Sequence, residues 1–562
     1  MAEAHLSIIL HWHHPWVLHH DVWPHGEVTL YESMAQAYIP QLSMLERLLH
    51  DGYRHVLTIS TSPVLLAQLR HPDVRIGFNH YLDERFYAIR EARKVARFSG
   101  LAGNLLDFWE AFYTRIRTVW EAKGGDLIAW MRDLHDRDAF EWATTPLSHP
   151  FLPHLGWDAW IRWHLHIGLH LFEHITGRSP TGFWLPELAY RPEGVWQPPV
   201  TTPFCPGGYR PSLAPWLDEA RIDWIVLDPI SVASGAPTPK KAPVQGLSSR
   251  VRLDAVDDPD LRLASGKDAY YPYHLHGTRK TAFFIRDGFT ARRVWSRFEG
   301  YPGDPVYLEF HKRTEESGLR LWAVTGVDVD LGQKRFYEPE TARQRAAEHA
   351  RDFVKRLITY VTSLSMPHPM VITAPFDGEL FGHWWFEGPV WLDAVIRRIG
   401  EEGPVEAITP GWYLKAHPPR LAFAPHSGTW GEGGDDRTWV NGKTRWLWER
   451  VYQFEREILE CELTAGLPPV DHRCILSEMA FLHASDWPFL ITTGQAGAYA
   501  TRRFKKHARM LRAFLDAWQQ SSVPEPGLVQ TCRVVDSLLI EGDPVERPIR
   551  YLSTWDRLRL GK

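Results

Sequence analysis

The chain has few cysteines, no excess of basic residues and no long hydrophobic run. Its four cysteines (Cys205, Cys461, Cys474 and Cys532) form no CxxC pair, which excludes a cysteine metal site and is typical of a reducing compartment. Lysine and arginine total 63 against 68 acidic residues, so no positive surplus is available to hold a nucleic acid. No segment approaches the roughly 18 apolar residues that cross a bilayer, and residues 1–10 lack the basic start of a signal peptide. We therefore expect a cytoplasmic protein with neither a nucleic-acid nor a membrane partner.

Tryptophan and histidine are plentiful, at 27 and 29 residues, whereas methionine occurs only 8 times. Both rings need a polar partner when they are buried, so a hydrophobic core alone rarely requires so many of them. Most of the tryptophans are expected to fill interfaces between helices. Those beside glycine and acidic residues suit a site that stacks on the flat faces of sugar rings.

Short apolar runs recur along the chain, and helical periods such as residues 35–49 and 341–364 lie between many of them. This strand–helix alternation predicts an α/β fold. Polar and charged residues directly follow several runs, which favours a barrel enzyme, where chemistry collects at the carboxyl ends of the strands. The predicted strands are residues 5–10, 55–60, 140–145, 182–186, 224–227, 282–285, 321–324, 370–374 and 406–408.

Three segments interrupt the alternation. Residues 63–138 form a long helical stretch, interpreted as a subdomain inserted into a catalytic barrel of residues 1–62 and 139–417. Residues 231–267 are rich in proline, glycine and serine and predict a long loop of the kind that often forms a lid. Strand signals fade in residues 418–562, which predicts a C-terminal helical domain. The amphipathic helices expected there are residues 446–463, 473–484 and 501–519.

Two acidic residues stand at the ends of predicted strands among aromatic residues. Glu187 follows the apolar run at 182–186, and Asp377 follows the run at 370–374. A carboxyl at the mouth of a buried strand loses part of its hydration, which raises its pKa and suits it to proton donation. One such acid alone is more often structural, as the cap of a loop or helix. Two that face each other across a barrel mouth have the arrangement that glycosidic bond cleavage requires.

Histidines follow two of the predicted strands. His11 and His13 are two residues apart, so they share one face of an extended segment, and His149 follows the third strand. Histidine is the commonest metal ligand, so the pattern alone allows a metal site of the kind used by metal-dependent deacetylases. The chain has no HExxH motif and no clear Asp/His pair to complete such a site. Exposed polar residues at the rim of a barrel are the simpler interpretation.

The stretches around the two acids resemble glycoside hydrolase family 57, and within it the members that introduce branches into α-1,4-glucans. WLPELAYRP, around Glu187, resembles the motif of the catalytic nucleophile, and FDGELFGHWWFEGP, around Asp377, resembles the motif of the general acid/base. The stretches 292–311, 429–441 and 484–500 are similar to stretches of the branching members. The resemblance therefore covers nearly the whole chain.

This resemblance implies an incomplete (β/α)7 barrel with an inserted helical subdomain and a C-terminal helical domain. It implies a retaining transglycosidase, in which Glu187 attacks C1 of an α-1,4-glucan such as amylose or glycogen and Asp377 protonates the departing O4. Asp377 then deprotonates the 6-hydroxyl of an acceptor chain, which becomes an α-1,6 branch. No metal or cofactor is implied, and Glu379 is interpreted as a supporting residue. The implied substrate-binding residues are His11, His13, His149, Arg286, Trp295, Gly303, Trp430, Trp439, Asp486 and Gln495.

Three features depart from the family pattern. The first motif reads HWHHPW, without the usual small or aliphatic residue between histidine and proline, and the second reads TTPLSHPFLP, closer to the amylase-like members. The loop 231–267 lacks the tyrosine with which branching members shield the intermediate, although Tyr270, Tyr271 and Tyr273 follow it. An α-1,4-glucan hydrolase of the α-amylase or amylopullulanase type is therefore the main alternative. A metal-dependent carbohydrate deacetylase and a non-catalytic glucan-binding protein are the remaining alternatives.

Overall fold

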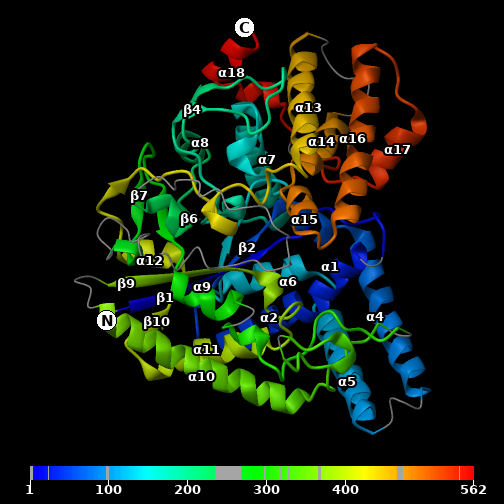
Figure 1. The fold of residues 1–562 in the computed structure, drawn as a ribbon, viewed down its shortest axis with the longest axis vertical. Coiled ribbons are helices and arrows are strands. Elements are labelled where there is room, and N and C mark those ends of the chain that lie inside the picture. Colours follow the sequence, from blue (N-terminus) through cyan, green and yellow to red (C-terminus); the bar gives the residue numbers. More distant parts are fainter. Residues whose placement is uncertain are drawn as a thin grey trace.

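The structure, a computed structural model (Figure 1), describes residues 4–22, 25–95, 100–233, 268–296, 299–315, 318–326, 328–364, 369–464, 472–543 and 545–561. Among these residues no helix has both the length and the apolar character needed to cross a membrane. The strands are β1 (Ala4–Trp12), β2 (Thr58–Thr61), β3 (Glu141–Ala143), β4 (Gly194–Trp196), β5 (Gly208–Arg210), β6 (Trp224–Leu227), β7 (Tyr273–Leu275), β8 (Ala282–Ile285), β9 (Met370–Asp377), β10 (Val405–Ala407) and β11 (Ala422–Phe423).

The α-helices fall into two sets along the chain. The first set comprises α1 (Glu27–Ser33), α2 (Ile39–His50), α3 (Pro63–Leu69), α4 (Pro72–Arg93), α5 (Leu101–Ala122), α6 (Leu127–Asp136), α7 (Asp158–Thr176), α8 (Ala214–Glu219), α9 (Gly288–Trp295), α10 (Pro339–Leu364), α11 (Gly388–Glu402) and α12 (Pro410–Ala416). The second set follows the last strand and comprises α13 (Arg445–Thr464), α14 (His472–His483), α15 (Asp486–Thr493), α16 (Gly497–Gln519), α17 (Pro526–Val534) and α18 (Thr554–Arg559). In Figure 1 the first set lies around the strands, while α13, α14, α16 and α17 stand together at the upper right.

Parallel pairing dominates the sheets, as expected where helices connect successive strands. Strand β1 pairs with β9 along almost its whole length, while β10 and β2 pair with the beginning and the end of β1 on its other edge. Strand β2 also pairs with β3, and a second sheet has the order β11-β7-β8-β6. Isolated parallel bridges join Thr144 to Phe183, Phe183 to Ile225, and Arg286 to Thr373. The two sheets are therefore linked to each other by parallel contacts at β6 and at the end of β8.

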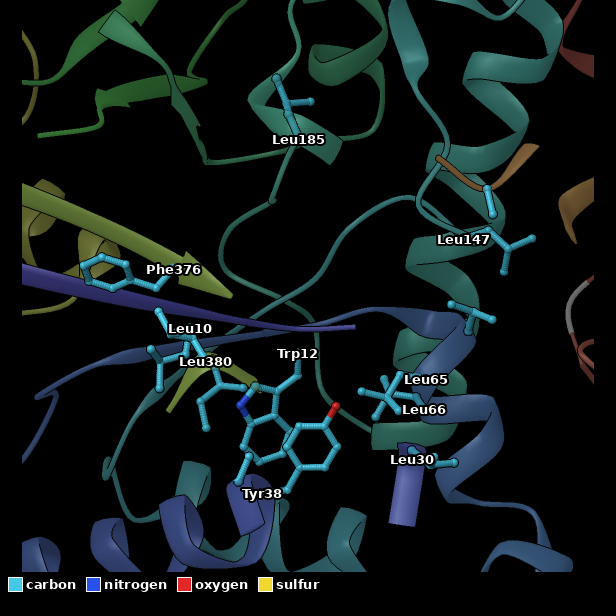
Figure 2. Packing of buried hydrophobic residues seen from close by; sticks show 14 of the residues in the cluster. Leu10, Trp12, Leu30, Tyr38, Leu65, Leu66, Leu147, Leu185, Phe376 and Leu380 are labelled. Carbon is cyan, nitrogen blue, oxygen red and sulfur yellow. The ribbon is translucent and has the colours of Figure 1, made fainter. Parts of the chain in front are cut away.

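Alternation along the strands separates two hydrophobic clusters. In β1, Leu6, Ile8, Leu10 and Trp12 belong to the large cluster that packs against the helices, whereas Ile9 belongs to a smaller one. The smaller cluster also receives alternate residues of β6, β8 and β9. Figure 2 shows the helix side of this packing, where the Trp12 ring stacks on Tyr38 with centroids 4.2 Å apart. Because side chains alternate between faces, His11 and Asp377 share the face of the smaller cluster.

The C-terminal set is fastened to the rest of the chain through the start of α7. The Asp556 carboxylate, in the first turn of α18, accepts hydrogen bonds from the backbone N–H groups of Asp158 and Ala159, both at 2.9 Å. It thereby caps a helix almost 400 residues away in the sequence, where free N–H groups and the helix dipole favour an anion. The Asp158 carboxylate in turn accepts from Arg210 at 2.5 Å and Arg191 at 3.3 Å. We call these residues, with Ser553, the α7–α18 joint.

Most of the predicted elements are present. The runs at 224–227 and 282–285 are β6 and β8, and the helix predicted at 473–484 is α14, which begins and ends one residue earlier. Two predicted strands are wrong. Residues 182–186 contribute only single bridges at Phe183, and residues 321–324 make only isolated bridges with Phe336 and Leu308. An apolar run predicts burial rather than strand pairing. The hydrophobic side chains Phe183, Trp184, Leu185, Leu321 and Ala323 of these two runs are buried, but neither run forms an extended strand ladder.

Candidate active site

Glu187 lies just beyond the Phe183 bridges, in a short 3-10 turn, Pro186–Leu188. Its φ of 61° is in the left-handed region, which non-glycine residues seldom adopt and which clusters at functional sites. The side chain is buried, and both carboxylate oxygens accept a hydrogen bond: Oε1 from the Ser485 hydroxyl at 2.8 Å and Oε2 from the Trp430 indole N–H at 2.9 Å. The carboxylate is therefore held in one orientation.

Trp430 is attached to Glu187 by its backbone as well as by its ring. Its N–H donates to the Glu187 carbonyl at 3.0 Å, and the neighbouring Gly428 bridges to Tyr190. The ring meets the Trp184 ring edge-on, and the Arg286 guanidinium lies 5.6 Å from its centroid. Trp430 thus combines a hydrogen bond to the acid with an aromatic surface beside it.

Asp377 is the last residue of β9 and pairs in register with His11 of β1. Burial raises its pKa well above the usual value, and the nearby carboxylates of Glu379, Glu187 and Asp486 raise it further, whereas Arg286 opposes them. Arg286 itself is paired with Asp228 at 3.2 Å. Glu187 and Asp377 are 190 residues apart in the sequence, yet they are close enough for the charge of one to affect the protonation of the other.

Burial also raises the pKa of Glu187, but the hydrogen bonds from Trp430 and Ser485 oppose this effect, because they stabilise the ionised form. Asp377 has no such compensation beyond the charge of Arg286. Two neighbouring carboxyls with environments that separate their protonation states are the arrangement in which one acts as an acid and the other as an anion. Asp377 is suited to the first role and Glu187 to the second.

Three histidine rings stack beside these acids. The His11 ring is parallel to Trp184, with centroids 4.7 Å apart, and the His13 and His149 rings stack at 4.3 Å. Each ring has its Nδ1 next to a serine hydroxyl. These contacts are His11 with Ser60 at 3.2 Å, His13 with Ser62 at 2.9 Å and His149 with Ser485 at 2.9 Å.

The histidines differ in charge. Burial lowers the pKa of His11 and of His149 well below the usual value, and the neighbouring His13 lowers both further. Burial alone would lower the pKa of His13 too, but Asp486, whose carboxylate lies 3.0 Å from His13 Nε2, raises it together with Glu379 and Glu187, so the pKa of His13 is raised. The pKa of His13 is therefore shifted in the opposite direction from that of its two neighbours, and Nε2 of His11 and of His149 is buried without a hydrogen-bond partner among the described residues.

Glu379 lies two residues beyond Asp377 and is also buried. Its carboxylate accepts hydrogen bonds from the Tyr38 hydroxyl and from the His13 backbone N–H, the latter at 3.1 Å. Burial raises the pKa of Glu379 to about 7, although these hydrogen bonds act in the opposite direction. These contacts connect Glu379 to Tyr38 and His13, and its supporting role stays a prediction.

Among the described residues, three groups of side chains have donor sets that suit a metal ion, and one of them lies in this site. His13, His149 and Asp486 each offer a ligand atom, and the three atoms lie within 4.8 Å of one another. Two imidazoles and a carboxylate are the ligand types of catalytic zinc sites. His13 and Asp486 already form an ion pair, however, so a cation would have to replace this contact.

The chain is similar to known proteins over nearly its whole length. The family model described as glycosyl hydrolase family 57 matches residues 7–423, and a model described as the C-terminal part of 1,4-alpha-glucan branching enzyme matches residues 473–541. The chain belongs to glycosyl hydrolase family 57. The two matched regions contain every residue of the cluster around Glu187 except Trp430, which lies between them.

Two curated proteins are similar to this chain along most of its length. A 1,4-alpha-glucan branching enzyme of Thermococcus kodakarensis is 34% identical over 521 residues, which cover 90% of this chain and 72% of that protein. A probable 1,4-alpha-glucan branching enzyme of Mycobacterium tuberculosis is 30% identical, with 91% of each chain covered.

Two solved structures show the same fold. The GH57-type branching enzyme of Pyrococcus horikoshii is 31% identical, with a TM-score of 0.86 and coverage of 98% of this chain and 97% of that one. The α-amylase AmyC of Thermotoga maritima is 22% identical, with a TM-score of 0.79 and coverage of 99% and 100%. The α/β fold with a C-terminal helical region is therefore that of the family 57 branching enzyme structures.

Nine of the twelve site residues predicted from the sequence come together in this family 57 structure. Trp295 is the last of these nine residues, and its ring centroid lies 6.0 Å from that of Trp430. Three others are not linked to the cluster by the contacts described above. Trp439 is only 1% exposed and packs against Phe151, Gln495 is exposed after the end of α15, and Gly303 ends a short turn at Tyr301–Gly303. Their roles in substrate binding stay predictions.

The tyrosines considered as shields of the intermediate have other partners. The Tyr270 hydroxyl is bonded to that of Tyr360, the Tyr271 hydroxyl donates to the Pro418 carbonyl at 2.8 Å, and Tyr273 stacks on Phe283 in the second sheet. Most of the predicted loop, residues 234–267, lies outside the described residues.

Sequence reasoning missed Ser485, Trp184 and Tyr38. Ser485 directly precedes Asp486, and Trp184 stands three residues before Glu187, so closeness to predicted site residues was the available signal for both. Tyr38 comes from the π-helical turn Met34–Tyr38, far from every motif that the sequence singled out. Only packing brings its hydroxyl to Glu379.

Proposed function

We propose that this family 57 protein is a 1,4-α-glucan branching enzyme, which cleaves an α-1,4-glucan and transfers the released chain to a 6-hydroxyl, making an α-1,6 branch. The observation that carries this proposal is the convergence of Glu187 and Asp377, two buried carboxyls of which Glu187 accepts hydrogen bonds on both oxygens, whereas the pKa of Asp377 is raised well above its usual value by burial and by neighbouring carboxylates. The relatives named branching enzymes, which match along nearly the whole chain, support the same reaction.

The proposed mechanism is a retaining double displacement. Glu187, whose charge is stabilised by Ser485 and Trp430, attacks C1 of the donor sugar, while protonated Asp377 gives its proton to the departing O4. Asp377, now ionised, then removes the proton of the acceptor 6-hydroxyl as that oxygen attacks C1 and releases Glu187. A retaining reaction requires the two carboxyls to be about 5–5.5 Å apart.

The surrounding residues are proposed to bind the donor sugar. The Nε2 atoms of His11 and His149, which have no hydrogen-bond partner among the described residues, are suited to accept hydrogen bonds from sugar hydroxyls. The Trp430 ring provides an apolar wall. Transfer to a sugar must compete with transfer to water, so the site gains from excluding solvent. The aromatic side chains around Glu187 (Trp184, Trp295 and Trp430) support this exclusion.

We further propose that the strands form an incomplete (β/α)7 barrel. Seven parallel segments support it: β1, β2, β3, the Phe183 segment, β6, β8 and β9, each joined to the next by pairing or by a parallel bridge. We keep residues 1–62 and 139–417 as the catalytic barrel, 63–138 as the inserted helical subdomain and 418–562 as the C-terminal domain. Before α13, this last segment contacts the barrel through β11 and Trp430.

Product analysis tests the proposed reaction. Amylose is incubated with the enzyme, the product is treated with a debranching enzyme, and chain lengths and reducing ends are measured before and after. New short chains that appear only after debranching are expected. Rising reducing ends without new α-1,6 linkages would instead identify a hydrolase. Loss of activity after exhaustive chelation would point to the metal-dependent alternative, for which the donor set is His13, His149 and Asp486.

A further inference from the structure

Ser485 lies where the C-terminal helices meet the barrel. It directly precedes α15 and is 1% exposed, and its backbone N–H donates to the His149 carbonyl at 3.0 Å. Its hydroxyl oxygen lies 2.9 Å from His149 Nδ1 and 2.8 Å from Glu187 Oε1. One buried hydroxyl therefore connects a histidine of the sugar site with the proposed nucleophile.

The single proton of this hydroxyl fixes the direction of both hydrogen bonds. An ionised carboxylate can only accept, so Ser485 donates to Glu187 and must accept from the Nδ1–H of His149. Because burial keeps His149 neutral, its Nε2 then carries a lone pair and no proton. This nitrogen is the one that lacks a partner among the described residues.

The serines behind the other two histidines are engaged differently. The Ser60 hydroxyl, next to His11, donates to the Thr144 carbonyl at 3.2 Å. The Ser62 hydroxyl, next to His13, accepts from the Leu65 backbone N–H and caps α3. Of these three serines, Ser485 is the one that also contacts a carboxylate, so its role is not the general one of orienting a ring.

We propose that Ser485 is a positioning residue for Glu187, whose hydroxyl holds the nucleophilic carboxylate in its ionised form and fixes His149 in the tautomer that accepts a hydrogen bond from the donor sugar. The proposal rests on the nucleophilic role of Glu187 in the proposed function. It makes the C-terminal helical region a contributor to the chemistry, because Ser485 and Asp486 stand at the start of α15, after all the barrel strands, and Ser485 is 298 residues from Glu187.

The serine keeps its proton throughout the reaction. When a Glu187 oxygen bonds to C1 and the C1–O4 bond breaks, the charge on the carboxylate disappears and its hydrogen bonds weaken. When the acceptor oxygen displaces Glu187 from C1, the charge returns and the Ser485 bond regains its strength. The hydroxyl therefore stabilises Glu187 as a leaving group in the second step as well as an anion in the first.

Ser485→Ala tests this role through the pH profile of kcat/KM for total α-1,4 cleavage, measured whatever the product. Because the hydroxyl also fixes the orientation of the Glu187 carboxylate and the tautomer of His149, its loss is expected to lower kcat/KM about tenfold or more at neutral pH. The Ser485 hydrogen bond lowers the pKa of Glu187, so its loss raises that pKa. Activity requires ionised Glu187, and the acid limb is therefore expected to move to higher pH.

Ser60→Ala is the matched control, because it removes a buried serine behind a neutral histidine of the same site without touching Glu187. It is expected to lower activity while leaving the acid limb in place, and Ser485→Thr is expected to restore the limb by restoring the hydroxyl. An unchanged limb in Ser485→Ala, or an equal movement in Ser60→Ala, would overturn the proposal. If Ser485→Ala does not fold, Ser485→Cys replaces it, because a thiol keeps the volume but donates only a weak hydrogen bond. The acid limb of Ser485→Cys is then expected to move to higher pH, and an unchanged limb would overturn the proposal.

The proposed function and the role of Ser485 can be rejected independently of each other. Cleavage without α-1,6 products would reject branching but would leave the acid-limb measurement valid. Full activity in Glu187→Gln would instead remove the nucleophile on which the role of Ser485 rests.

Discussion

Two buried clusters of charged residues connect the N-terminal part of the chain with the C-terminal helices, and they differ in how their carboxylates are compensated. In the α7–α18 joint, both oxygens of Asp158 and of Asp556 accept hydrogen bonds, and two arginines balance the charge. In the active site, Glu187, Asp377, Glu379 and Asp486 crowd together, and burial with mutual repulsion raises the pKa of Asp377. In the joint, burial and the Asp158 charge still raise the pKa of Asp556 to about 6, but every carboxylate oxygen is hydrogen-bonded, whereas the crowded acids of the active site include one, Asp377, that is suited to exchange a proton.

The difference also appears in the neighbouring polar atoms. In the joint, the Asp556 carboxylate occupies N–H groups that α7 would otherwise leave free. In the active site, Nε2 of His11 and Nε2 of His149 are buried without a partner among the described residues. Buried polar atoms that protein groups do not satisfy indicate a place for a ligand, here the hydroxyls of the proposed sugar. The unpaired Nε2 atoms of the proposed sugar site lower the stability of the fold, whereas the hydrogen bonds that Asp556 accepts in the joint raise it.

The largest effect is expected from Glu187→Gln. Total α-1,4 cleavage should fall by about 10⁴-fold, because the amide cannot attack C1. The thermal unfolding midpoint should stay the same or rise, since a neutral amide avoids the cost of burying a charge. Activity on amylose and the melting temperature of the same sample check both statements. A large loss of stability would mean that the Glu187 carboxylate stabilises the fold, as the carboxylates of the joint do.

A smaller effect, on stability, is expected from Asp158→Asn. Removing the carboxylate leaves Arg210, which is 0% exposed, and Arg191 buried without their counter-charge. The free energy of unfolding should fall by about 3–5 kcal/mol, measured by urea denaturation. The control is Glu402→Gln, which removes an exposed ion pair with Arg398 and should change stability by less than about 0.5 kcal/mol. Equal stabilities of the two variants would contradict the assigned role of the joint.

The smallest effect is expected from Glu379→Gln, which tests the electrostatic repulsion between the carboxylates of the active site. The Glu379 charge raises the pKa of Asp377, so its removal lowers that pKa. The first step requires protonated Asp377, and activity is lost as the pH rises through its pKa. The alkaline limb of kcat/KM should therefore move to lower pH.

Tyr38→Phe is the companion variant for this test. Tyr38 lowers the pKa of Glu379 by donating to it, so its removal keeps Glu379 neutral over a wider pH range. The alkaline limb should move in the same direction as in Glu379→Gln. An alkaline limb that moves to higher pH in either variant would reject the coupling between Glu379 and Asp377.

Local sequence patterns were enough to predict the strands whose apolar runs coincide with long ladders, such as β9, and the two acids that follow strand segments among local motifs. They also placed His11 and Asp377 at strand ends, because alternation and strand length are local properties. They did not separate Trp430 from Trp439, since both stand in one stretch and only packing buries the second. The tertiary structure alone decided that Ser485, 298 residues from Glu187, and Trp430, 243 residues from it, hold its carboxylate. Such contacts depend on how distant elements pack, and no period or spacing within one segment encodes them.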